Sequence, residues 1–115
     1  MDARFLRTRM LLGSDAMDRL AQAHVCVLGL GGVGSWCAEA LARSGVGELT
    51  LMDQDTVDLS NLNRQAEALE PTLGLPKAEA MAQRVLAVNP NCRVHPIQGR
   101  YEADSREAFF AANYD

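Results

Sequence analysis

The sequence predicts an α/β fold: a Rossmann-like parallel sheet with flanking helices, truncated to its N-terminal nucleotide-binding half. Two continuous apolar runs, Val25–Leu28 and Leu49–Met52, are typical of parallel strands that are buried on both faces. Between them, a glycine-rich turn is followed by Val33–Arg43, whose apolar residues recur at helical spacing, and Gly45 stands where such a helix ends. Strand, turn, helix and strand form one βαβ unit, 24–53, with a right-handed crossover.

The bulk composition indicates one small domain, 1–115. Of the 115 residues, 48% are hydrophobic and 23% are charged, which is ordinary for a globular protein. The net charge of −4 argues against a broad nucleic-acid-binding surface. The three cysteines are unclustered, which suits a reducing compartment, and the N-terminus has neither a signal-peptide nor a membrane-span pattern. We therefore expect a cytoplasmic protein with no membrane partner.

The N-terminal segment, 1–23, is predicted to be an arm followed by a first helix. Arg4–Leu12 is a mixed basic and apolar arm. Ser14 then offers an N-cap for a helix over Asp15–Gln22, because its hydroxyl can accept a hydrogen bond from an unpaired N–H of the first turn.

The segments that follow the βαβ unit are predicted to be a loop and then a helix, a strand and a helix. Residues 54–76 are expected to form a polar, irregular phosphate loop with one helical turn around Ala66–Leu69. A loop of this length inside a compact domain is usually functional. The elements expected in 77–115 are a helix over Lys77–Val88 that Pro76 starts, a strand over Arg93–Ile97, and a helix from Ser105 to about Asn113.

The glycine turn, Gly29-Leu30-Gly31-Gly32-Val33-Gly34, predicts a nucleotide site. Glycine lets the backbone turn tightly and approach a phosphate, whose charge the N-terminus of the next helix favours. Asp53 lies 19 residues past Gly34 at the tip of the second strand, where a carboxylate can accept hydrogen bonds from both ribose hydroxyls. The pattern does not choose between NAD and ATP, and a tight turn with no ligand is the alternative.

The loop after Asp53 favours ATP, because it carries cations that an NAD site does not need. Arg64 and Lys77 can both reach back toward the extra charge of a triphosphate, with Asn61 as a neutral donor. The alternative is a solvated polar loop with surface charges.

Together these motifs resemble those of the E1-like (ThiF/MoeB/ubiquitin-activating) adenylyltransferase superfamily. The similarity runs from Arg4 to about Ile97, which is nearly the whole chain. The motifs that carry it, in order, are Gly29–Gly34, Asp53-x-Asp55, Ser60-Asn61-x-x-Arg64-Gln65 and Gly74-x-Pro76/Lys77.

The resemblance implies an ATP site and assigns its residues. Three side chains would act in catalysis, stabilising charge as pyrophosphate departs: Arg64, Lys77 and, inserted into the neighbouring subunit's ATP site, Arg7. The alternative for Arg7 is a surface arginine on a flexible arm. The residues that would bind ATP are Gly29, Gly31, Gly32, Gly34, Asp53, Asp55, Asn61, Arg64, Gln65 and Lys77.

The residue sequence of two stretches resembles that of one branch of the superfamily, the ATP-dependent tRNA threonylcarbamoyladenosine dehydratases. These stretches are Gly31–Leu41 and Asn61–Gln65. The resemblance implies a homodimer with ATP and tRNA as partners. The alternative is an adenylyltransferase of molybdopterin or thiamine biosynthesis, whose partner is a ubiquitin-like sulfur carrier protein. An NAD-dependent oxidoreductase domain and a non-catalytic dimerisation module also stay open.

The superfamily continues with a strand whose terminal aspartate binds Mg²⁺, and this chain stops where that strand should begin. We therefore expect the Mg²⁺ ligand beyond Asp115 and assign no metal ligand within the chain. The chain alone is expected to be inactive. It is also expected to self-associate, through the arm or through the unpaired edge of Val25–Leu28.

The remaining reactive side chains are predicted to be structural. Cys26 and Cys37 are expected in the core, because free cysteine is among the most buried residue types, whereas Cys92 follows a helix and is expected at the surface. Trp36 is expected to be a packing residue. No role is predicted for the two histidines, which are His24 and His95.

Overall fold

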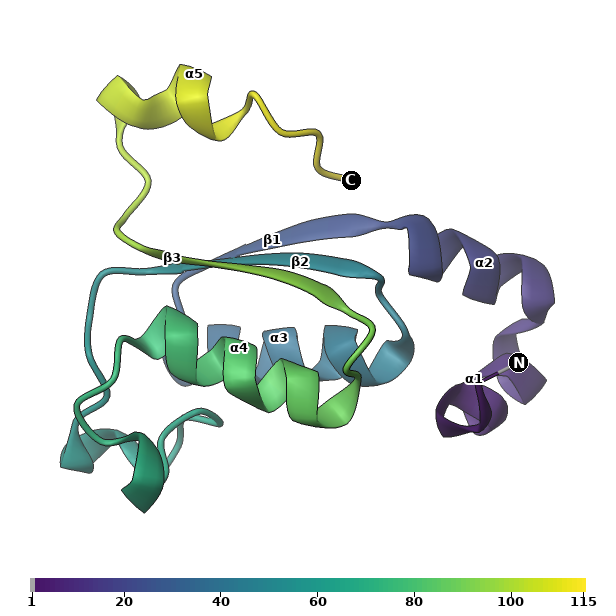
Figure 1. The fold of residues 1–115 in the computed structure, drawn as a ribbon, viewed down its shortest axis with the longest axis horizontal. Helices are drawn as coiled ribbons and strands as arrows, with labels where there is room; N and C mark the ends of the chain where they lie inside the picture. Colours follow the sequence, from purple (N-terminus) through teal and green to yellow (C-terminus); the bar gives the residue numbers. More distant parts are fainter. Residues whose placement is uncertain (1) are drawn as a thin grey trace.

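The computed structural model describes residues 2–115 and contains one sheet of three parallel strands in the order β1-β2-β3 (Figure 1). Met1, the first residue of the predicted arm, lies outside the described residues. The strands are β1 (His24–Leu28), β2 (Glu48–Asp53) and β3 (Arg93–Gln98). These strands confirm the predicted parallel sheet, and β1 lies at its edge as expected.

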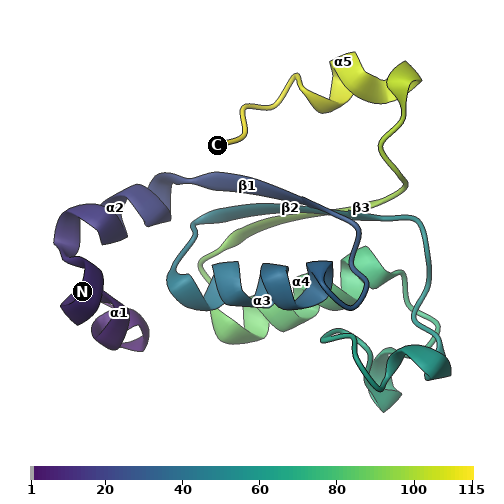
Figure 2. The same ribbon diagram turned by 180° about the vertical axis from the view of Figure 1, so that it is seen from behind.

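Two helices, α3 (Gly34–Ser44) and α4 (Lys77–Val88), cover one face of this sheet (Figures 1 and 2). Both helices pack alanine side chains against the strands; these are Ala38 and Ala42 in α3 and Ala78 and Ala82 in α4. Gly45 ends α3 in the left-handed conformation, with a φ of 99°, as its position in the sequence predicts. The buried apolar residues shared by the two helices and the sheet are Val27, Ala38, Ala42, Leu49, Leu51, Ala78, Met81, Ala82 and Val85.

The other face of the sheet is more open, so the prediction that β1 is buried on both faces is wrong. Successive side chains of a strand point to opposite faces. Val27 points to α3 and is buried, whereas Leu28 is 53% exposed and Cys26 is only half-buried. Above this open face lie α5 (Arg106–Phe109) and the C-terminal tail (Figure 1).

The N-terminal segment is helical, contrary to the predicted arm. It forms a 3-10 turn, η1 (Ala3–Phe5), then α1 (Leu6–Leu12) and α2 (Ser14–Gln22). Ser14 is not the N-cap of α2, because it is already the first helical residue and makes no capping hydrogen bond. Gly13 occupies the cap position with a φ of 88°, a conformation that glycine adopts without strain and that separates the two helices.

The loop 54–76 is packed rather than solvated, and its helical turn at Ala66–Leu69 does not form. The N–H groups of Ala66 and Leu69 instead donate to the hydroxyls of Ser35 and Thr72, which removes them from local helical bonding. The turns that do form are η2 (Leu59–Asn61) and η3 (Glu70–Thr72). The apolar side chains of the loop form a small core with Ala80 of α4; these loop residues are Val57, Leu62, Ala68, Leu73 and Leu75.

The last predicted helix is shorter than expected. Instead of running from Ser105 to Asn113, it consists of η4 (Ala103–Ser105) and the single turn of α5. The chain then crosses to the edge of β1, where the Asp115 N–H donates to the His24 carbonyl oxygen at 2.7 Å. None of the helices in 2–115 combines the length and the apolar character that crossing a bilayer requires.

Candidate functional site

The glycine turn between β1 and α3 needs glycine at two positions for geometric reasons. Gly29 has a φ of +89°, and its N–H donates to the Met52 carbonyl oxygen at 2.8 Å, which ties the end of β1 to β2. A Cβ on Gly34 would lie 1.8 Å from the Gly29 carbonyl oxygen, so no side chain fits there. The backbone at Gly31 has open space above it, as a bound phosphate would require.

Asp53 ends β2 and holds this turn in place. One carboxylate oxygen accepts the Leu30 N–H at 2.7 Å, and the other accepts the Asp55 N–H at 2.8 Å. The Asp55 carbonyl oxygen in turn accepts the Lys77 N–H at 2.9 Å, which connects the first residue of α4 to the same turn. The predicted role of Asp53 at the ribose remains a prediction, and it uses lone pairs that these backbone bonds leave free. Asp53, Asp55 and Gly29 border a hollow of about 220 Å³ at the carboxyl ends of the strands.

Arg64 lies over the glycine turn, as the sequence predicted. A Cβ built on Gly32 would lie 3.5 Å from the Cδ atom of Arg64, so the arginine stem covers this glycine. Its guanidinium donates to the Ser60 carbonyl oxygen at 3.2 Å and to Asn63 Oδ1 at 2.8 Å. These are single bonds to neutral acceptors, and the exposed guanidinium keeps further N–H groups for an anion.

Trp36 anchors the backbone beneath Arg64, a role that its prediction as a packing residue did not include. Its ring is 48% exposed, and its Nε1–H donates to the Arg64 carbonyl oxygen at 2.7 Å. Ser35, the preceding residue on α3, accepts the Ala66 N–H at 3.1 Å. The first turn of α3 therefore grips the loop at two successive points. An indole donor in the first turn of the helix was the signal in the sequence that could have indicated this contact.

Asn61 and Gln65 are buried within the loop rather than exposed to solvent. Asn61 Oδ1 accepts the Asp58 N–H at 2.7 Å, so the side chain closes the η2 turn, and its amide nitrogen is the part suited to a phosphate. Gln65 is 6% exposed, and its Oε1 atom has no hydrogen-bond partner among residues 2–115. Their predicted contacts with ATP remain predictions.

Lys77 is buried at the start of α4, and its charge acts on two carboxylates of the loop. It is 7% exposed. Hydrogen bonds from Ser60 keep the pKa of Asp58 below its ordinary value, and the Lys77 charge lowers it further. The same charge acts on Glu67. Among residues 2–115 no carboxylate forms a close ion pair with this ammonium, and a buried ammonium favours an incoming anion because little solvent screens it.

Glu67 is a member of this site that the sequence did not single out. Its side chain is 1% exposed, and neither carboxyl oxygen has a hydrogen-bond partner among the described residues. Burial raises the pKa of Glu67 from its ordinary value of 4.5 to about 7, with Asp53 raising it further and Lys77 opposing the rise. The signal available in the sequence was an acid between two alanines in a loop otherwise expected to be solvated.

Arg7 lies apart from the glycine turn. It is exposed on α1, which packs beyond the amino-terminal ends of the strands, whereas the glycine turn is at their carboxyl ends (Figure 1). The structure therefore does not bring Arg7 together with Arg64 and Lys77 of its own chain.

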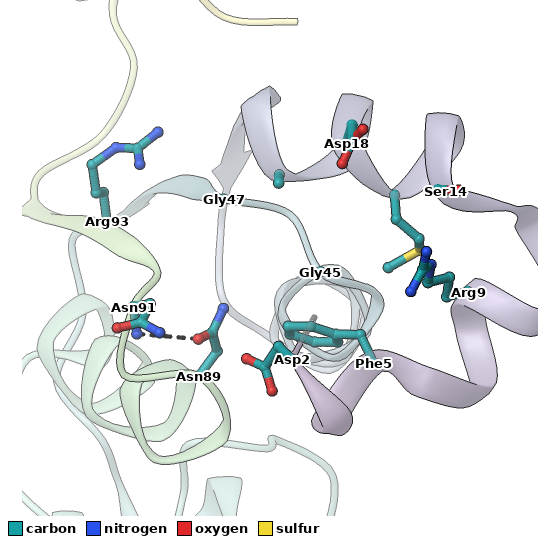
Figure 3. Close-up of a pocket in the computed structure, with 12 residues that line it drawn as sticks. Asp2, Phe5, Arg9, Ser14, Asp18, Gly45, Gly47, Asn89, Asn91 and Arg93 are labelled. Carbon is teal, nitrogen blue, oxygen red and sulfur yellow. Dashed lines mark hydrogen bonds between the residues drawn. The ribbon is translucent and has the colours of Figure 1, made fainter.

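A larger hollow, of about 570 Å³, also lies at the amino-terminal end of the sheet (Figure 3). Its walls include Phe5 and Arg9 from the N-terminal helices and Asn89 after α4, whose Oδ1 accepts the Asn91 N–H at 3.1 Å. In open parallel sheets ligands bind at the carboxyl ends of the strands, so we do not assign the nucleotide to this hollow.

The predictions for Cys37 and Cys92 are wrong, and Cys26, which was expected in the core, is only half-buried. Cys37 was expected in the core and is exposed, because it lies on the face of α3 that points away from the sheet. Cys92 was expected at the surface and is buried 3.6 Å from the Val46 carbonyl oxygen. Burial raises the pKa of the Cys92 thiol, which makes it a poor nucleophile.

Metal-ligating side chains in groups of three occur within 2–115 only at His24, Glu48 and His95, away from the glycine turn.

The family profile and the relatives of this chain point to the same family. The profile of the ThiF family matches residues 5–115. The tRNA threonylcarbamoyladenosine dehydratase of Escherichia coli strain K12 is 47% identical over 111 residues, which cover 96% of this chain and 41% of that protein. The molybdopterin-synthase adenylyltransferase of Salmonella typhimurium is 38% identical over 112 residues, covering 96% and 45%. This chain thus spans less than half the length of these relatives.

Solved structures agree with the sequence relatives. The crystal structure of the E. coli tRNA N6-threonylcarbamoyladenosine dehydratase in complex with ATP matches with a TM-score of 0.93 and 47% identity, covering 96% of this chain and 46% of that one. The same enzyme in complex with AMP matches with a TM-score of 0.94.

The glycine turn provides a matched pair of substitutions. We expect Gly34→Ala to lower the free energy of unfolding by roughly 2–4 kcal/mol, because the new Cβ collides with the Gly29 carbonyl oxygen. Gly31→Ala meets open space and should cost less than about 1 kcal/mol. Urea denaturation followed by circular dichroism measures both. Equal stability of the two variants would contradict the turn geometry.

Glu67 makes stability depend on pH. Because its pKa is raised in the folded chain, its contribution to stability is fully present below about pH 4.5 and is lost as the pH rises through about 7. Glu67→Gln cannot ionise, so at pH 8 it should be more stable than the native chain by up to about 3 kcal/mol, and near pH 5 the two should differ little.

Urea unfolding at pH 5, 6, 7 and 8 measures this dependence, with Glu70→Gln as the control, since Glu70 is exposed on the same loop. A pH dependence that survives in Glu67→Gln would show that another group causes it.

Proposed function

This chain belongs to the ThiF family, and on that premise we propose that it is the ATP-binding half of a tRNA threonylcarbamoyladenosine dehydratase. In the proposed reaction a carboxylate oxygen attacks the α-phosphorus of ATP, the bond to the β-phosphate oxygen breaks, and pyrophosphate leaves. An internal nucleophile of the substrate then displaces AMP from the acyl-adenylate and closes a ring. The observation that carries the proposal is that the Arg64 stem lies beside Gly32, in the glycine turn between β1 and α3.

The glycine turn is the proposed seat of the α-phosphate. The backbone at Gly31, which has open space above it, and at Gly32, beside the Arg64 stem, leads into the N-terminus of α3, where the N–H groups of the first turn and the helix dipole favour negative charge. Gly29 and Gly34 shape the turn. The carboxylate of Asp53, fixed by its two backbone donors, faces the proposed ribose position.

Arg64 and Lys77 are the proposed electrostatic catalysts. Arg64, in the loop 54–76, is exposed and able to swing, whereas Lys77, directly after the loop, is buried and fixed at the start of α4. Cations positioned before the reaction stabilise the charge that develops on the leaving pyrophosphate and need no rearrangement as it forms. Asn61, Asp55 and Gln65 complete the proposed phosphate loop.

Arg7 is proposed to act in a homodimer. It lies at the end of the sheet opposite its own glycine turn, so a role at an ATP site requires another copy of the chain (Figure 1). The exposed apolar side chains of α1 offer a surface for such a contact, among them Met10 and Leu11 at 71% and 83% exposed. We also propose that the protein is cytoplasmic and that Mg²⁺ accompanies ATP.

The second candidate function is adenylation of a ubiquitin-like sulfur carrier protein, favoured by the 38% identity to a molybdopterin-synthase adenylyltransferase. The two functions share the ATP site and differ in the acceptor. Pyrophosphate exchange, measured on a protein that spans the full length of these relatives, separates them. Exchange stimulated by threonylcarbamoyl-modified tRNA supports the dehydratase, and exchange stimulated only by a sulfur carrier protein supports the alternative.

The roles of the two cations predict a selective loss of affinity for ATP. We expect Arg64→Gln and Lys77→Gln each to raise the dissociation constant for ATP roughly 10-fold to 100-fold, because each removes a charge-assisted hydrogen bond to the outer phosphates. The dissociation constant for AMP, which lacks those phosphates, should change less than about 3-fold. Isothermal titration calorimetry measures both ligands.

The control is Arg19→Gln, which removes an exposed cation from α2 at the other end of the sheet. NADH is titrated alongside. Tighter binding of NADH than of ATP, or equal losses for ATP and AMP, would contradict the proposed site.

Dimerisation is tested separately by sedimentation equilibrium. We expect a dimer at micromolar concentration, and we expect Arg7→Gln to weaken ATP binding only at concentrations where the dimer forms. The Met10→Asp and Leu11→Asp double variant should be monomeric, because it places charge in the proposed apolar contact. A native chain that stays monomeric while Arg7→Gln still weakens ATP binding would contradict the in-trans role.

A further inference from the structure

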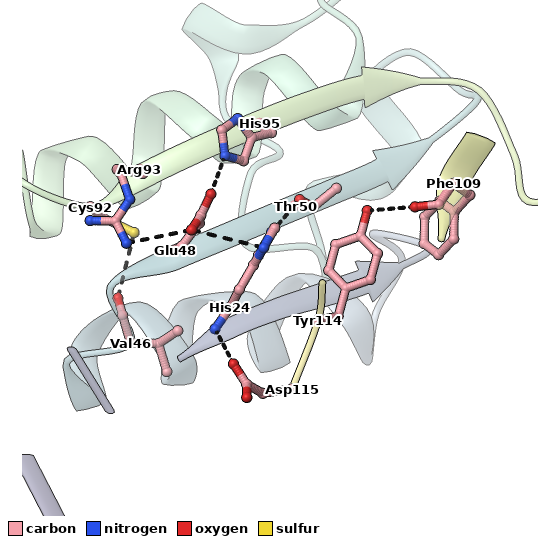
Figure 4. Close-up of polar contacts among 10 residues, drawn as sticks. All are labelled: His24, Val46, Glu48, Thr50, Cys92, Arg93, His95, Phe109, Tyr114 and Asp115. Atoms are coloured by element: carbon pink, nitrogen blue, oxygen red, sulfur yellow. Dashed lines mark hydrogen bonds and ion pairs between the residues drawn. The ribbon is translucent and has the colours of Figure 1, made fainter. Parts of the chain in front are cut away.

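Both histidines of the chain meet at one glutamate on the open face of the sheet (Figure 4). His24 begins β1, Glu48 begins β2, and His95 is the third residue of β3. The strand register explains their meeting: His24 is opposite Glu48, and His95 is opposite Thr50, two residues along the same face. Residues that are 71 positions apart in the sequence therefore converge through backbone pairing.

The nitrogen and oxygen atoms of this cluster lie at distances close to those of a metal site. His95 Nε2 lies 2.7 Å from Glu48 Oε2, and His24 Nδ1 lies 3.8 Å from Glu48 Oε1. The ligand atoms of all three side chains lie within 4.8 Å of one another. Neighbouring ligands of tetrahedral Zn²⁺ are about 3.3 Å apart, given metal–ligand bonds of about 2.0–2.2 Å. Small side-chain rotations reach that spacing from the observed one.

A second contact orients His24 as a ligand. Its Nε2 atom lies 2.7 Å from the hydroxyl oxygen of Thr50, which is 3% exposed. When Nε2–H donates to this hydroxyl, Nδ1 carries the lone pair and points toward Glu48. Histidine ligands of metals almost always donate their other N–H to such an outer acceptor. The Tyr114 ring packs in a T-shaped arrangement with the same imidazole, and the centroids of the two rings are 4.6 Å apart.

We propose that His24, Glu48 and His95 bind one divalent transition-metal ion, of which Zn²⁺ is the best match. Two imidazoles and one carboxylate are a known ligand set for zinc, and a water molecule completes the tetrahedron. The ion ties together all three strands at their amino-terminal ends. The site lies at the end of the sheet opposite the glycine turn, so it is independent of the proposed ATP site.

Arg93 competes with the ion for Glu48. Its Nη2 atom lies 3.4 Å from Glu48 Oε1, and its side chain is 59% exposed, so it can move into solvent when the ion binds. Replacing Arg93 by glutamine should therefore increase the affinity of the site for the metal ion. Removing an exposed, screened cation is worth up to a factor of about 5 in affinity.

The test is titration of the 115-residue chain with Co²⁺, followed by displacement with Zn²⁺. One equivalent of Co²⁺ should give visible d–d bands without the thiolate-to-cobalt charge-transfer band that cysteine ligands produce, and Zn²⁺ should remove those bands. His95→Gln should weaken Zn²⁺ binding at least about 100-fold. Thr50→Val should weaken it roughly 10-fold to 100-fold, as loss of an outer contact does. Arg93→Gln should tighten it by up to about 5-fold.

Cys37→Ser is the matched control, because Cys37 is the exposed thiol of the chain and should not affect the bands. Circular dichroism of His95→Gln, whose native side chain is half exposed, establishes that the variant is folded. Zn²⁺ should also raise the melting temperature of the native chain but not that of His95→Gln. Charge-transfer bands lost in Cys37→Ser, or unchanged affinity in His95→Gln, would overturn the proposal.

Discussion

The carboxylate of Asp53 is the contact on which the arrangement of the candidate site depends. Through its two oxygens it joins the glycine turn at Leu30 to the start of the loop at Asp55, and Asp55 joins α4 at Lys77. These three consecutive hydrogen bonds connect elements that are far apart in the sequence. Their donors are backbone N–H groups, so the geometry is set by the chain path, and a ligand finds it already formed.

A second set of contacts brings Arg64 to the same place. Ser35 and Trp36, in the first turn of α3, hold the backbone of the loop at Ala66 and Arg64. Behind them, a two-point ion pair between Glu39 and Arg84 fastens α3 to α4, and the guanidinium lowers the pKa of the Glu39 carboxyl. The middle of the loop is thus held by α3, and its end continues into α4. This packing buries the carboxyl group of Glu67, for which residues 2–115 supply no hydrogen-bond partner.

The sequence predicted the sheet, its parallel strands and both covering helices, because these follow from apolar periodicity and from glycine at defined positions. It placed Arg64 near the turn for a different reason, because a triphosphate needs cations beyond the glycine turn and because the motif resembles that of the E1-like superfamily. It failed where tertiary contacts override local preference. The predicted helical turn at Ala66–Leu69 does not form because the N–H groups of Ala66 and Leu69 donate to side-chain hydroxyls. The burial of Glu67 depends on packing within a loop whose sequence is mostly polar. The meeting of His24 with His95 depended on strand register, which no local pattern encodes.

The most direct measurement is a crystal structure of this chain with a non-hydrolysable ATP analogue. We expect the α-phosphate against the backbone of Gly31 and Gly32, with Arg64 and Lys77 nitrogen atoms within about 3.2 Å of β- or γ-phosphate oxygens. A nucleotide seated in the turn while both side chains point away from its phosphates would contradict the convergence of these two cations, and so would a nucleotide bound elsewhere on the sheet.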